Sequence, residues 1–315
     1  MAKLNIAYFG APDFASGVLK RIVEDTDLPV TVRFVATQPD RKAGRKQILT
    51  STPVKQRALQ MKIPVIDNLE FNTLHSKLKE VDLVLLYAFG SLLPANILKM
   101  PKWGFWNIHP SLLPQYRGTS PITYSLLMGE KTTGVSLMEM DERMDHGSIL
   151  NQKTYEIQEE DTRENLEKRL SDIGYELFKQ SVQLLIDGTL QKVEQNHEKR
   201  TFTRLLTKQD GFIPFPIVQK ILKGEPLIKD DVPAIISNYF LKYGTPPAYN
   251  FQLSAFNLFR GLSPWPGLWT VIPGKKRLKI TRMQCIKGMP VITHVQLEGK
   301  KEVDITTFQT AYNVS

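Results

Sequence analysis

Short apolar runs alternate with segments of helical spacing through the first half of the chain. The apolar runs predict β-strands at residues 4–10, 30–37, 63–66, 81–89, 104–109 and 134–140. Apolar positions that recur every three or four residues predict helices at residues 12–25, 53–61, 71–80, 119–130 and 162–187. Because such alternation is typical of a sheet covered on both faces, we predict an α/β fold with a mainly parallel, doubly wound sheet. Functional residues of such sheets gather at the carboxyl ends of the strands.

The pattern changes after Gly188. Residues 189–210 are polar, basic and weakly periodic, which is typical of a linker. Residues 213–250 hold helical pieces interrupted by prolines, and short strand-like runs follow a Pro-Trp-Pro turn at residues 264–266. We therefore predict a domain of residues 1–188, a basic linker of residues 189–210 and a smaller β-rich domain of residues 211–315, whose segment 213–250 is unusually helical.

Composition narrows the class of protein. Of the 315 residues, 42% are hydrophobic and 23% are charged, which indicates a globular protein with a core. No apolar run approaches the roughly 20 residues that cross a bilayer, and no signal-peptide cleavage site follows the first strand. The single cysteine, Cys285, excludes an internal disulfide. We expect a cytoplasmic monomer that has no membrane partner.

The positive charge is concentrated late in the chain. Residues 1–189 carry 23 Lys and Arg against 23 Asp and Glu, whereas residues 190–315 carry 18 against 9. The whole net charge of +9 therefore lies in the C-terminal part. Such a surface is either a solvated basic face or a site for a polyanion, because Lys and Arg displace counterions from phosphates.

The stretch "NIHPSLLPQYRG", Asn107 to Gly118, is the first candidate for chemistry. Asn107 and His109 end a predicted buried strand, and alternation along a strand places both side chains on one face. An amide can donate to a developing oxyanion, and an imidazole can exchange a proton near neutral pH. Pro110 and Pro114 stiffen the following loop. Taken alone, an Asn-x-His pair is also compatible with a structural histidine bonded to a backbone carbonyl.

The second candidate is the acidic segment 138–150, which follows the next predicted strand. It contains Asp141, Glu142, Asp145 and Gly147. If the two strands are parallel neighbours, their carboxyl-end loops meet, and a carboxylate can fix the tautomer of His109 and favour its protonated form. The pattern alone does not choose between Asp141 and Asp145, and an ordinary acidic turn remains an alternative.

The third candidate is the basic segment 37–62, which begins at the end of a strand. Its basic residues are Arg41, Lys42, Arg45, Lys46, Lys55, Arg57 and Lys62, and its acid is Asp40. A long basic loop near an active site could contact a phosphate backbone, although a plain solvated loop is equally compatible. A Rossmann dinucleotide site is disfavoured because the G-x-G-x-x-G spacing is absent, and the five histidines show no metal-ligand spacing.

Together, these stretches resemble the methionyl-tRNA formyltransferase family. "FGAPDFA" at residues 9–15 resembles its opening turn, and "TQPDRKAGR" at residues 37–45 is similar to its tRNA-contacting loop. "NIHPSLLPQYRGTSPI" and "GVSLMEMDERMDHGSIL" resemble its formyl-transfer signature, and "SPWPGLWT" with "KKRLKI" resembles its C-terminal domain. Relatives that formylate glycinamide ribonucleotide or nucleotide sugars share the Asn-x-His and Asp set, which therefore marks the fold and not one substrate.

The resemblance implies a formyltransferase fold with a C-terminal barrel of the oligonucleotide-binding type. It implies that Asn107, His109 and Asp145 are the catalytic residues. It implies 10-formyltetrahydrofolate as the formyl donor, held by Tyr87, Ala88, Phe89, Ser111, Leu112, Leu113, Pro114 and Met140. It implies initiator methionyl-tRNA as the partner, contacted by Arg41, Lys42, Arg45, Lys46, Arg200, Arg204, Lys275, Lys276 and Arg277. No resident metal is implied.

The implied reaction moves a formyl group from a folate nitrogen to the amine of methionine on tRNA, in support of translation initiation. Asn107 and protonated His109 would stabilise the oxygen of a tetrahedral carbon, and Asp145 would hold His109. Three other functions remain open: a sugar-nucleotide amine formyltransferase, a hydrolase that releases formate, and a tRNA-binding protein without activity. The chain departs from the family where "MDHGS" places His146 beside Asp145, and we expect His146 to face solvent.

Overall fold

A computed structural model of the chain describes residues 3–43, 47–67 and 71–312. Contacts group the chain into two compact units. Unit 1 comprises Met1–Arg117, Gly134–Tyr155 and Glu167–Phe202, and unit 2 comprises Gly118–Thr133, Glu156–Leu166 and Thr203–Ser315. The three-part division drawn from the sequence stays a prediction. No helix among the described residues is long and apolar enough to cross a membrane.

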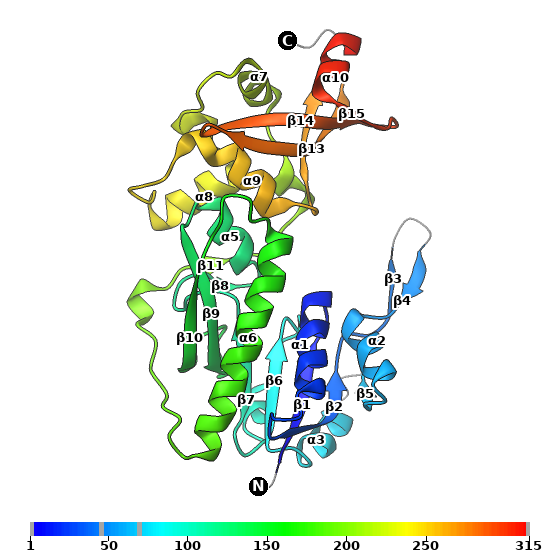
Figure 1. Ribbon diagram of the computed structural model, residues 1–315, viewed down its shortest axis with the longest axis vertical. Helices are drawn as coiled ribbons and strands as arrows, with labels where there is room; N and C mark the ends of the chain where they lie inside the picture. The colour runs from blue at the N-terminus through cyan, green and yellow to red at the C-terminus, as the bar shows by residue number, and fades with distance from the viewer. Residues whose placement is uncertain (1–2, 44–46, 68–70, 313–315) are drawn as a thin grey trace. The chain divides into compact units, whose positions relative to one another are not determined.

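Unit 1 is built on a seven-stranded sheet with the order β10-β9-β7-β6-β1-β2-β5 (Figure 1). Its strands are β1 (Leu4–Gly10), β2 (Val30–Ala36), β5 (Val65–Ile66), β6 (Leu83–Tyr87), β7 (Phe105–His109), β9 (Thr132–Glu139) and β10 (Ile149–Glu156). Its helices are α1 (Asp13–Glu24), α2 (Pro53–Gln60), α3 (Phe71–Leu78), α4 (Ala95–Leu98) and α6 (Arg163–Ile186). Strands β5, β2, β1, β6 and β7 are parallel, which confirms the predicted mainly parallel α/β sheet.

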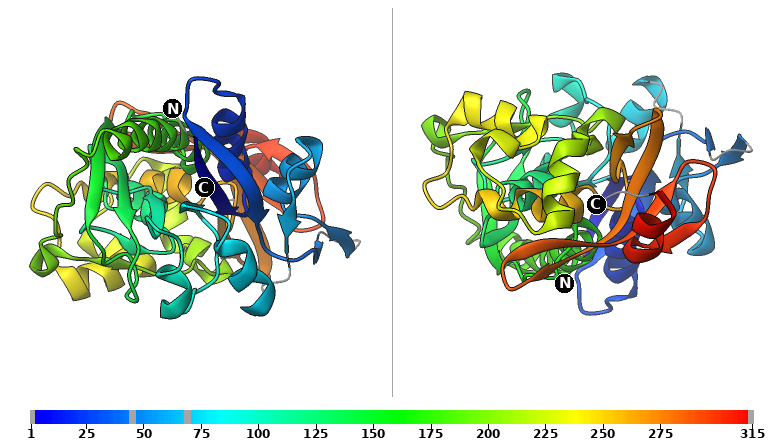
Figure 2. Two further views of the ribbon diagram at one scale, coloured as in Figure 1. Left: turned by 90° about the horizontal axis from the view of Figure 1, so that it is seen from below. Right: turned by 90° about the horizontal axis from the view of Figure 1, so that it is seen from above.

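Alternation along β7 assigns its side chains to two faces of the sheet. Trp106 packs against Phe178 of α6, and a Cβ at Gly174 of α6 would lie 2.6 Å from Ile108. Phe105 instead belongs to a buried cluster on the opposite face, with side chains from β1, α3 and α4. Figure 2 shows helices on both sides of these strands. Asn107 and His109 therefore share the face of Phe105.

Unit 2 combines a small antiparallel sheet with short helices. The sheet order is β12-β13-β14-β15, with β12 (Leu268–Ile272), β13 (Lys276–Ile286), β14 (Met289–Leu297) and β15 (Glu302–Asp304). The helices are α5 (Pro121–Leu127), α7 (Phe215–Lys223), α8 (Ala234–Tyr243), α9 (Ser254–Leu262) and α10 (Ile305–Tyr312), and the 3-10 turns are His197–Lys199 in unit 1 and Lys208–Gly211, Lys229–Asp231 and Phe251–Leu253 in unit 2. The predicted smaller β-rich part is confirmed.

Helices α5 and α9 pack closely although more than a hundred residues separate them. A Cβ at Gly261 would lie 2.5 Å from Leu127, and the Tyr249 hydroxyl donates to the Leu127 carbonyl at 3.3 Å. These contacts explain why residues 118–133 belong to unit 2 rather than to the unit that surrounds them in sequence.

Four local features were not predicted from the sequence. Two of them are strand β10 and the hairpin of β3 (Arg41–Ala43) with β4 (Ile48–Thr50). The third is at Ser120, which precedes α5 at the N-cap position although its side chain makes no capping hydrogen bond. The fourth is a two-stranded ribbon of β8 (Arg117–Gly118) and β11 (Phe202–Thr203), which gives structure to the segment interpreted as a linker.

Helices α1 and α6 are joined by a cluster of charged side chains. Arg21 donates to Asp172 at 2.6 Å and to Glu176 at 2.7 Å. At the end of α1, Asp25 accepts hydrogen bonds from Lys179, at 2.6 Å, and from the Tyr175 hydroxyl. The hydrogen bond from Lys179, followed by that from Tyr175, lowers the pKa of Asp25 from 3.8 to about 2.

This lowered pKa predicts an acid-sensitive contribution to stability. Because the folded-state pKa of Asp25 lies below its unfolded value, the contribution is complete above about pH 4 and is lost as pH falls toward 2. Asp25→Asn should lower the free energy of unfolding at pH 7, and the gap to the native sequence should close in acid. Urea titrations at several pH values measure this gap, with Asp27→Asn as the control. A gap that does not change with pH would contradict the assignment.

Candidate active site

Asn107 and His109 are held in place by burial at the carboxyl end of β7. Their exposed fractions are 8% and 4%. The Nε2 atom of His109 lies 3.1 Å from the carbonyl oxygen of Tyr116, and because a carbonyl only accepts, Nε2 must donate. The other ring nitrogen, Nδ1, faces the Oδ1 atom of Asp145 at 3.7 Å. The Nδ2 atom of Asn107 lies 3.5 Å from the same oxygen. The three side chains thus converge.

The route that brings Asp145 to this point differs from the one that the sequence suggested. Strand β9 runs antiparallel to β7, so that Ser136 lies opposite His109 and Glu139 lies opposite Trp106. The argument from parallel neighbours is therefore wrong, because β9 ends at the far end of β7. Asp145 arrives because the loop after β9 folds back along the strand.

The geometry of that loop is tight. Asp145 has a φ of 48°, in the left-handed region that residues with a side chain rarely adopt. A Cβ at Gly147 would lie 2.0 Å from the carbonyl oxygen of Glu139, so only glycine fits there. Asp141, the other candidate acid, lies 2.6 Å from Nδ1 of His146. The structure thus places Asp145, and not Asp141, within reach of His109.

We expected His146 to face solvent, but the structure shows it largely covered by neighbouring side chains. Its side chain is 24% exposed and stacks on His197, with ring centroids 4.0 Å apart and planes 8° from parallel. His197 in turn accepts from Nη2 of Arg117 at 2.8 Å. Burial, followed by the charges of His146 and Arg117, lowers the pKa of His197. The histidine beside Asp145 is therefore held between Asp141 and His197.

Hydrogen bonds from β9 and β10 hold the proline-rich loop that follows His109. The Ser136 hydroxyl donates to the Ser111 carbonyl at 2.7 Å and accepts from the Leu113 amide at 3.0 Å. The side chain of Gln152 donates to Ser136 at 2.7 Å and to the Leu113 carbonyl at 3.1 Å. Loop 111–114 is therefore fixed by neighbours, in addition to Pro110 and Pro114.

The residues implied for the formyl donor occupy different environments. The side chains of Tyr87 and Phe89 are 0% and 1% exposed, and the Tyr87 hydroxyl pairs with Ser171, so both residues could meet a ligand only through backbone atoms. Ala88, with φ of 49°, lies between them at the carboxyl end of β6. Met140 packs against the buried cluster that contains Phe105. Because β9 is antiparallel, Met140 lies near the start of β7, away from His109.

The predicted basic segment 37–62 contains the hairpin β3–β4, followed by helix α2. Arg41 donates to Gln38 at 2.9 Å, and Lys42 is exposed on the same strand. Arg45 and Lys46 lie outside the described residues. Lys55 is held by Asp40 at 2.8 Å and by Asp67 at 2.6 Å, so its charge is compensated within the fold.

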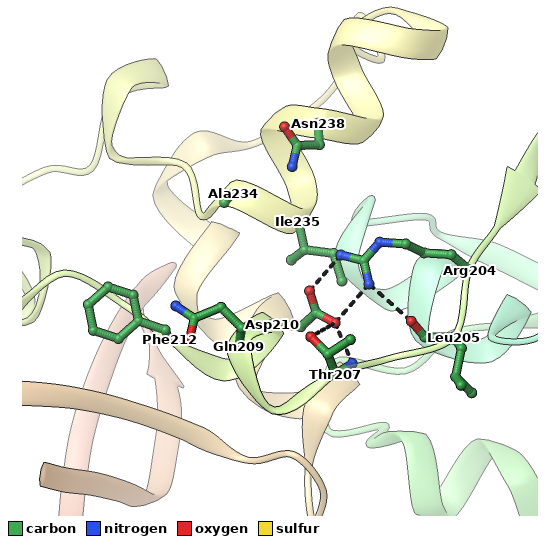
Figure 3. Close-up of a pocket in the computed structure, with 9 residues that line it drawn as sticks. All are labelled: Arg204, Leu205, Thr207, Gln209, Asp210, Phe212, Ala234, Ile235 and Asn238. Atoms are coloured by element: carbon green, nitrogen blue, oxygen red, sulfur yellow. Dashed lines mark hydrogen bonds and ion pairs between the residues drawn. The ribbon is translucent and has the colours of Figure 1, made fainter.

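Two other predicted tRNA-contacting residues already have acceptors within the protein. Arg200 donates to the His197 carbonyl at 2.5 Å. Figure 3 shows Arg204 in a pocket of about 410 Å³, where it donates to both carboxylate oxygens of Asp210 at 2.6 and 2.8 Å. Burial raises the pKa of Asp210, but the hydrogen bonds from Arg204 and Thr207 outweigh it, and the pKa is lowered overall. Any phosphate at Arg204 must therefore compete with Asp210.

The remaining three basic residues lie on the β-rich sheet of unit 2. Lys275 occupies the turn before β13 with φ of 60°, and Lys276 is exposed at the start of that strand. The guanidinium of Arg277 lies 4.1 Å from the centroid of the Trp269 ring on β12. Arginine over an aromatic face is a stable arrangement at a partly exposed site.

Several residues that shape the site were missed by sequence reasoning. Three of them are polar residues whose hydrogen bonds join segments distant in sequence: Ser136, Gln152 and Gln195. No local sequence pattern predicts such contacts. Arg117 lies in the quoted stretch 107–118 and was given no role from the sequence, yet it is 2% exposed and donates to Gln195 at 2.6 Å. The sequence signal that could have identified Arg117 was its position within the stretch 107–118, which also contains Asn107 and His109.

Comparison with known proteins identifies the family of this chain. Residues 3–182 match the family model described as "Formyl transferase". A curated methionyl-tRNA formyltransferase from Bacillus cereus is 35% identical over 276 residues, which cover 86% of this chain and 76% of that protein.

Solved structures show the same fold. A 4-N formyltransferase from Francisella tularensis superposes with a TM-score of 0.60 at 16% identity, covering 88% of this chain and 96% of that one. A sugar N-formyltransferase from Shewanella superposes with a TM-score of 0.57 at 18% identity and the same coverage. At these identities the likeness concerns the fold alone. The family match and the curated relative together show that this chain is a formyl transferase and belongs to the methionyl-tRNA formyltransferase family.

Proposed function

We propose that this enzyme transfers the formyl group of 10-formyltetrahydrofolate to the α-amine of initiator methionyl-tRNA. The observation that carries the proposal is the convergence of Asn107, His109 and Asp145 at the carboxyl end of β7. The curated relative named for this activity supports the choice of acceptor. Donor and acceptor would meet where the amide and the imidazole face the carboxylate.

In this reaction a bond forms between the methionine nitrogen and the formyl carbon, and the bond from that carbon to the folate nitrogen breaks. Negative charge develops on the formyl oxygen as the amine attacks. Asn107 donates a hydrogen bond to that oxygen, and the loss of one such donor typically raises the barrier by roughly 3–4 kcal/mol. Burial strengthens the effect because the surroundings of Asn107 exclude water.

His109 supplies a second donor through Nδ1 when that nitrogen is protonated, because the Nε2 hydrogen is already donated to the Tyr116 carbonyl. The Tyr116 carbonyl fixes the proton on Nε2, which leaves Nδ1 as the nitrogen that exchanges a proton toward Asp145. The attacking amine loses one proton and the departing folate nitrogen gains one, so the step is neutral overall. Asp145 holds His109 and relays that proton.

Apart from Met140, the residues implied for the formyl donor are compatible with a site built mainly from backbone. Loop 111–114 is fixed by Ser136 and Gln152, and the strand end at residues 87–89 presents backbone atoms because its large side chains are buried. Rigid backbone groups can hold a polar ring at small entropic cost. These two segments would hold the folate, and they position it beside His109.

The proposed activity predicts a separation between catalysis and tRNA binding. Labelled formyl should pass from 10-formyltetrahydrofolate to charged initiator tRNA. His109→Ala should lower kcat by at least about 100-fold, because it removes a donor to the charged oxygen. The dissociation constant for tRNA should change by less than about threefold, because His109 is buried. Filter binding and single-turnover transfer provide the two readouts.

Three outcomes would point elsewhere. Efficient transfer to a nucleotide-linked amino sugar, but not to methionyl-tRNA, would identify a sugar-nucleotide enzyme. Formate release without an acceptor would identify a hydrolase. Tight tRNA binding without turnover would leave a binding protein, which the family membership argues against.

The basic hairpin generates a separate prediction about salt. Replacing Arg41 and Lys42 with Ala should raise the KM for tRNA and reduce the slope of log affinity against log salt by about 1 to 2, because each phosphate contact releases counterions. Lys77→Ala, on an exposed lysine paired with Glu80, serves as the control. An unchanged slope in the hairpin variant would remove β3 from the tRNA interface.

A further inference from the structure

Gln195 is a buried residue within an otherwise exposed stretch. It is 4% exposed, whereas the residues just before it, from 191 to 194, are all exposed. A buried amide must satisfy its hydrogen-bonding groups or destabilise the fold. The contacts of Gln195 therefore indicate what residues 189–202 do in unit 1.

The side chain of Gln195 connects the loop that carries Asp145 to Arg117. Its Nε2 atom donates to the carbonyl oxygen of Asp145 at 3.0 Å and to that of Gly147 at 2.7 Å. Its Oε1 atom accepts from Arg117, at 3.2 Å from Nε and at 2.6 Å from Nη2. Two carbonyls and one guanidinium thus surround a single amide group.

This arrangement permits one orientation of the amide. Carbonyl oxygens only accept, and a guanidinium only donates. A flipped Gln195 would place its oxygen against two carbonyls and its NH₂ group against Arg117. The side chain is therefore locked, and it fixes the distance between Arg117 and the loop of Asp145.

The loop needs such a restraint. Asp145 is held at φ of 48°, in the left-handed region that residues with a side chain rarely adopt. Without a partner for its carbonyl, the residue would relax toward a more common conformation and carry its carboxylate away from His109. Gln195 binds the carbonyls on both sides of His146.

Gln195 and His109 are held by two consecutive residues, Arg117 and Tyr116. The Tyr116 carbonyl accepts from Nε2 of His109, and the next residue, Arg117, holds Gln195. Thr201, in the same segment as Gln195, fixes both residues: its hydroxyl accepts from the Tyr116 amide and its carbonyl from the Arg117 amide, each at 2.9 Å. One dipeptide thus determines where the imidazole and the carboxylate lie.

We propose that Gln195 is a positioning residue for Asp145, and that through this one buried side chain the part of unit 1 that follows Gly188 contributes to the active site. The inference rests on the proposed function, since it assigns Gln195 a part in the same formyl transfer. The residue lies beyond residues 3–182, which match the family model. It acts through the carbonyls of Asp145 and Gly147 and does not touch the substrates.

A double-mutant cycle tests this role. Gln195→Ala should lower kcat by about 10- to 100-fold, the usual effect of misplacing a catalytic group by about 1 Å. KM for both substrates should stay within about threefold. In an Asp145→Ala background the same substitution should change the residual single-turnover rate by less than about twofold, because the group that it positions is gone.

Two further variants sharpen the experiment. Gln195→Glu keeps the length of the side chain and its contact with Arg117, but places an oxygen against the two carbonyls. It should therefore lower kcat as much as Gln195→Ala does, and it keeps the test available if the alanine variant folds poorly. Gln191→Ala makes the same chemical change at an exposed site in the segment and should leave kcat unchanged. Thermal unfolding of each variant reports whether it folds.

Amide hydrogen exchange over residues 144–148 provides a readout that needs no substrate. Exchange should accelerate in Gln195→Ala and Gln195→Glu and not in Gln191→Ala. Equal losses of rate in both backgrounds, or an unchanged kcat, would overturn the proposal. If the native enzyme fails to formylate methionyl-tRNA, the proposed function fails, and exchange alone decides the role of Gln195: no acceleration would refute it.

Discussion

The contact between Asp145 and His109 is the interaction on which the rest of the site depends. Both side chains are largely buried, with side-chain exposures of 15% and 5%. A carboxylate and an imidazole removed from water are unfavourable unless they face partners. Here the Tyr116 carbonyl accepts from one nitrogen of the ring, and the carboxylate faces the other together with Asn107. The sheet supplies a rigid strand end, and the loop after β9 must reach it.

That loop is shaped by its surroundings more than by its own sequence. Antiparallel pairing of β9 with β7 leaves the loop at the wrong end of the strand, so it must return across several residues. Glycine at position 147 allows close contact with the Glu139 carbonyl, and the stacked pair of His146 and His197 covers one side. Burial lowers the pKa of Arg117, and the charge of Asp145 opposes this effect. The neutral amide of Gln195 satisfies donors and acceptors between these charged groups without adding another charge.

The sequence predicted those features that follow from local periodicity. The strands at residues 4–10 and 104–109 and helix α6 were recognisable because buried strands are apolar runs and helices repeat every three or four residues. Asn107 and His109 could be placed on one face for the same reason. Strand β10 was missed because its sequence, "ILNQKTYE", is mostly polar and half exposed. The direction of β9 could not be predicted, since strand polarity depends on tertiary connections that no window of residues contains. The resemblance, rather than periodicity, selected Asp145 over Asp141.

The distribution of basic residues shows why net charge alone does not locate a nucleic-acid surface. Lys55, Arg204 and Lys220 each lie within 2.8 Å of a carboxylate oxygen, so intramolecular ion pairs compensate their charges. Lys275 and Lys276 are exposed at the start of β13, where a phosphate can approach without displacing an acid. Arg204 is bound bidentately to Asp210, so a phosphate could bind it only by replacing that carboxylate. The exchange of one anion for another gives little net gain in binding free energy, and it depends on whether the phosphate can match the geometry of the carboxylate. Part of the positive charge of residues 190–315 is therefore paired within the fold, so net charge measures the long-range field of this region and not the number of cations that can meet an anion directly.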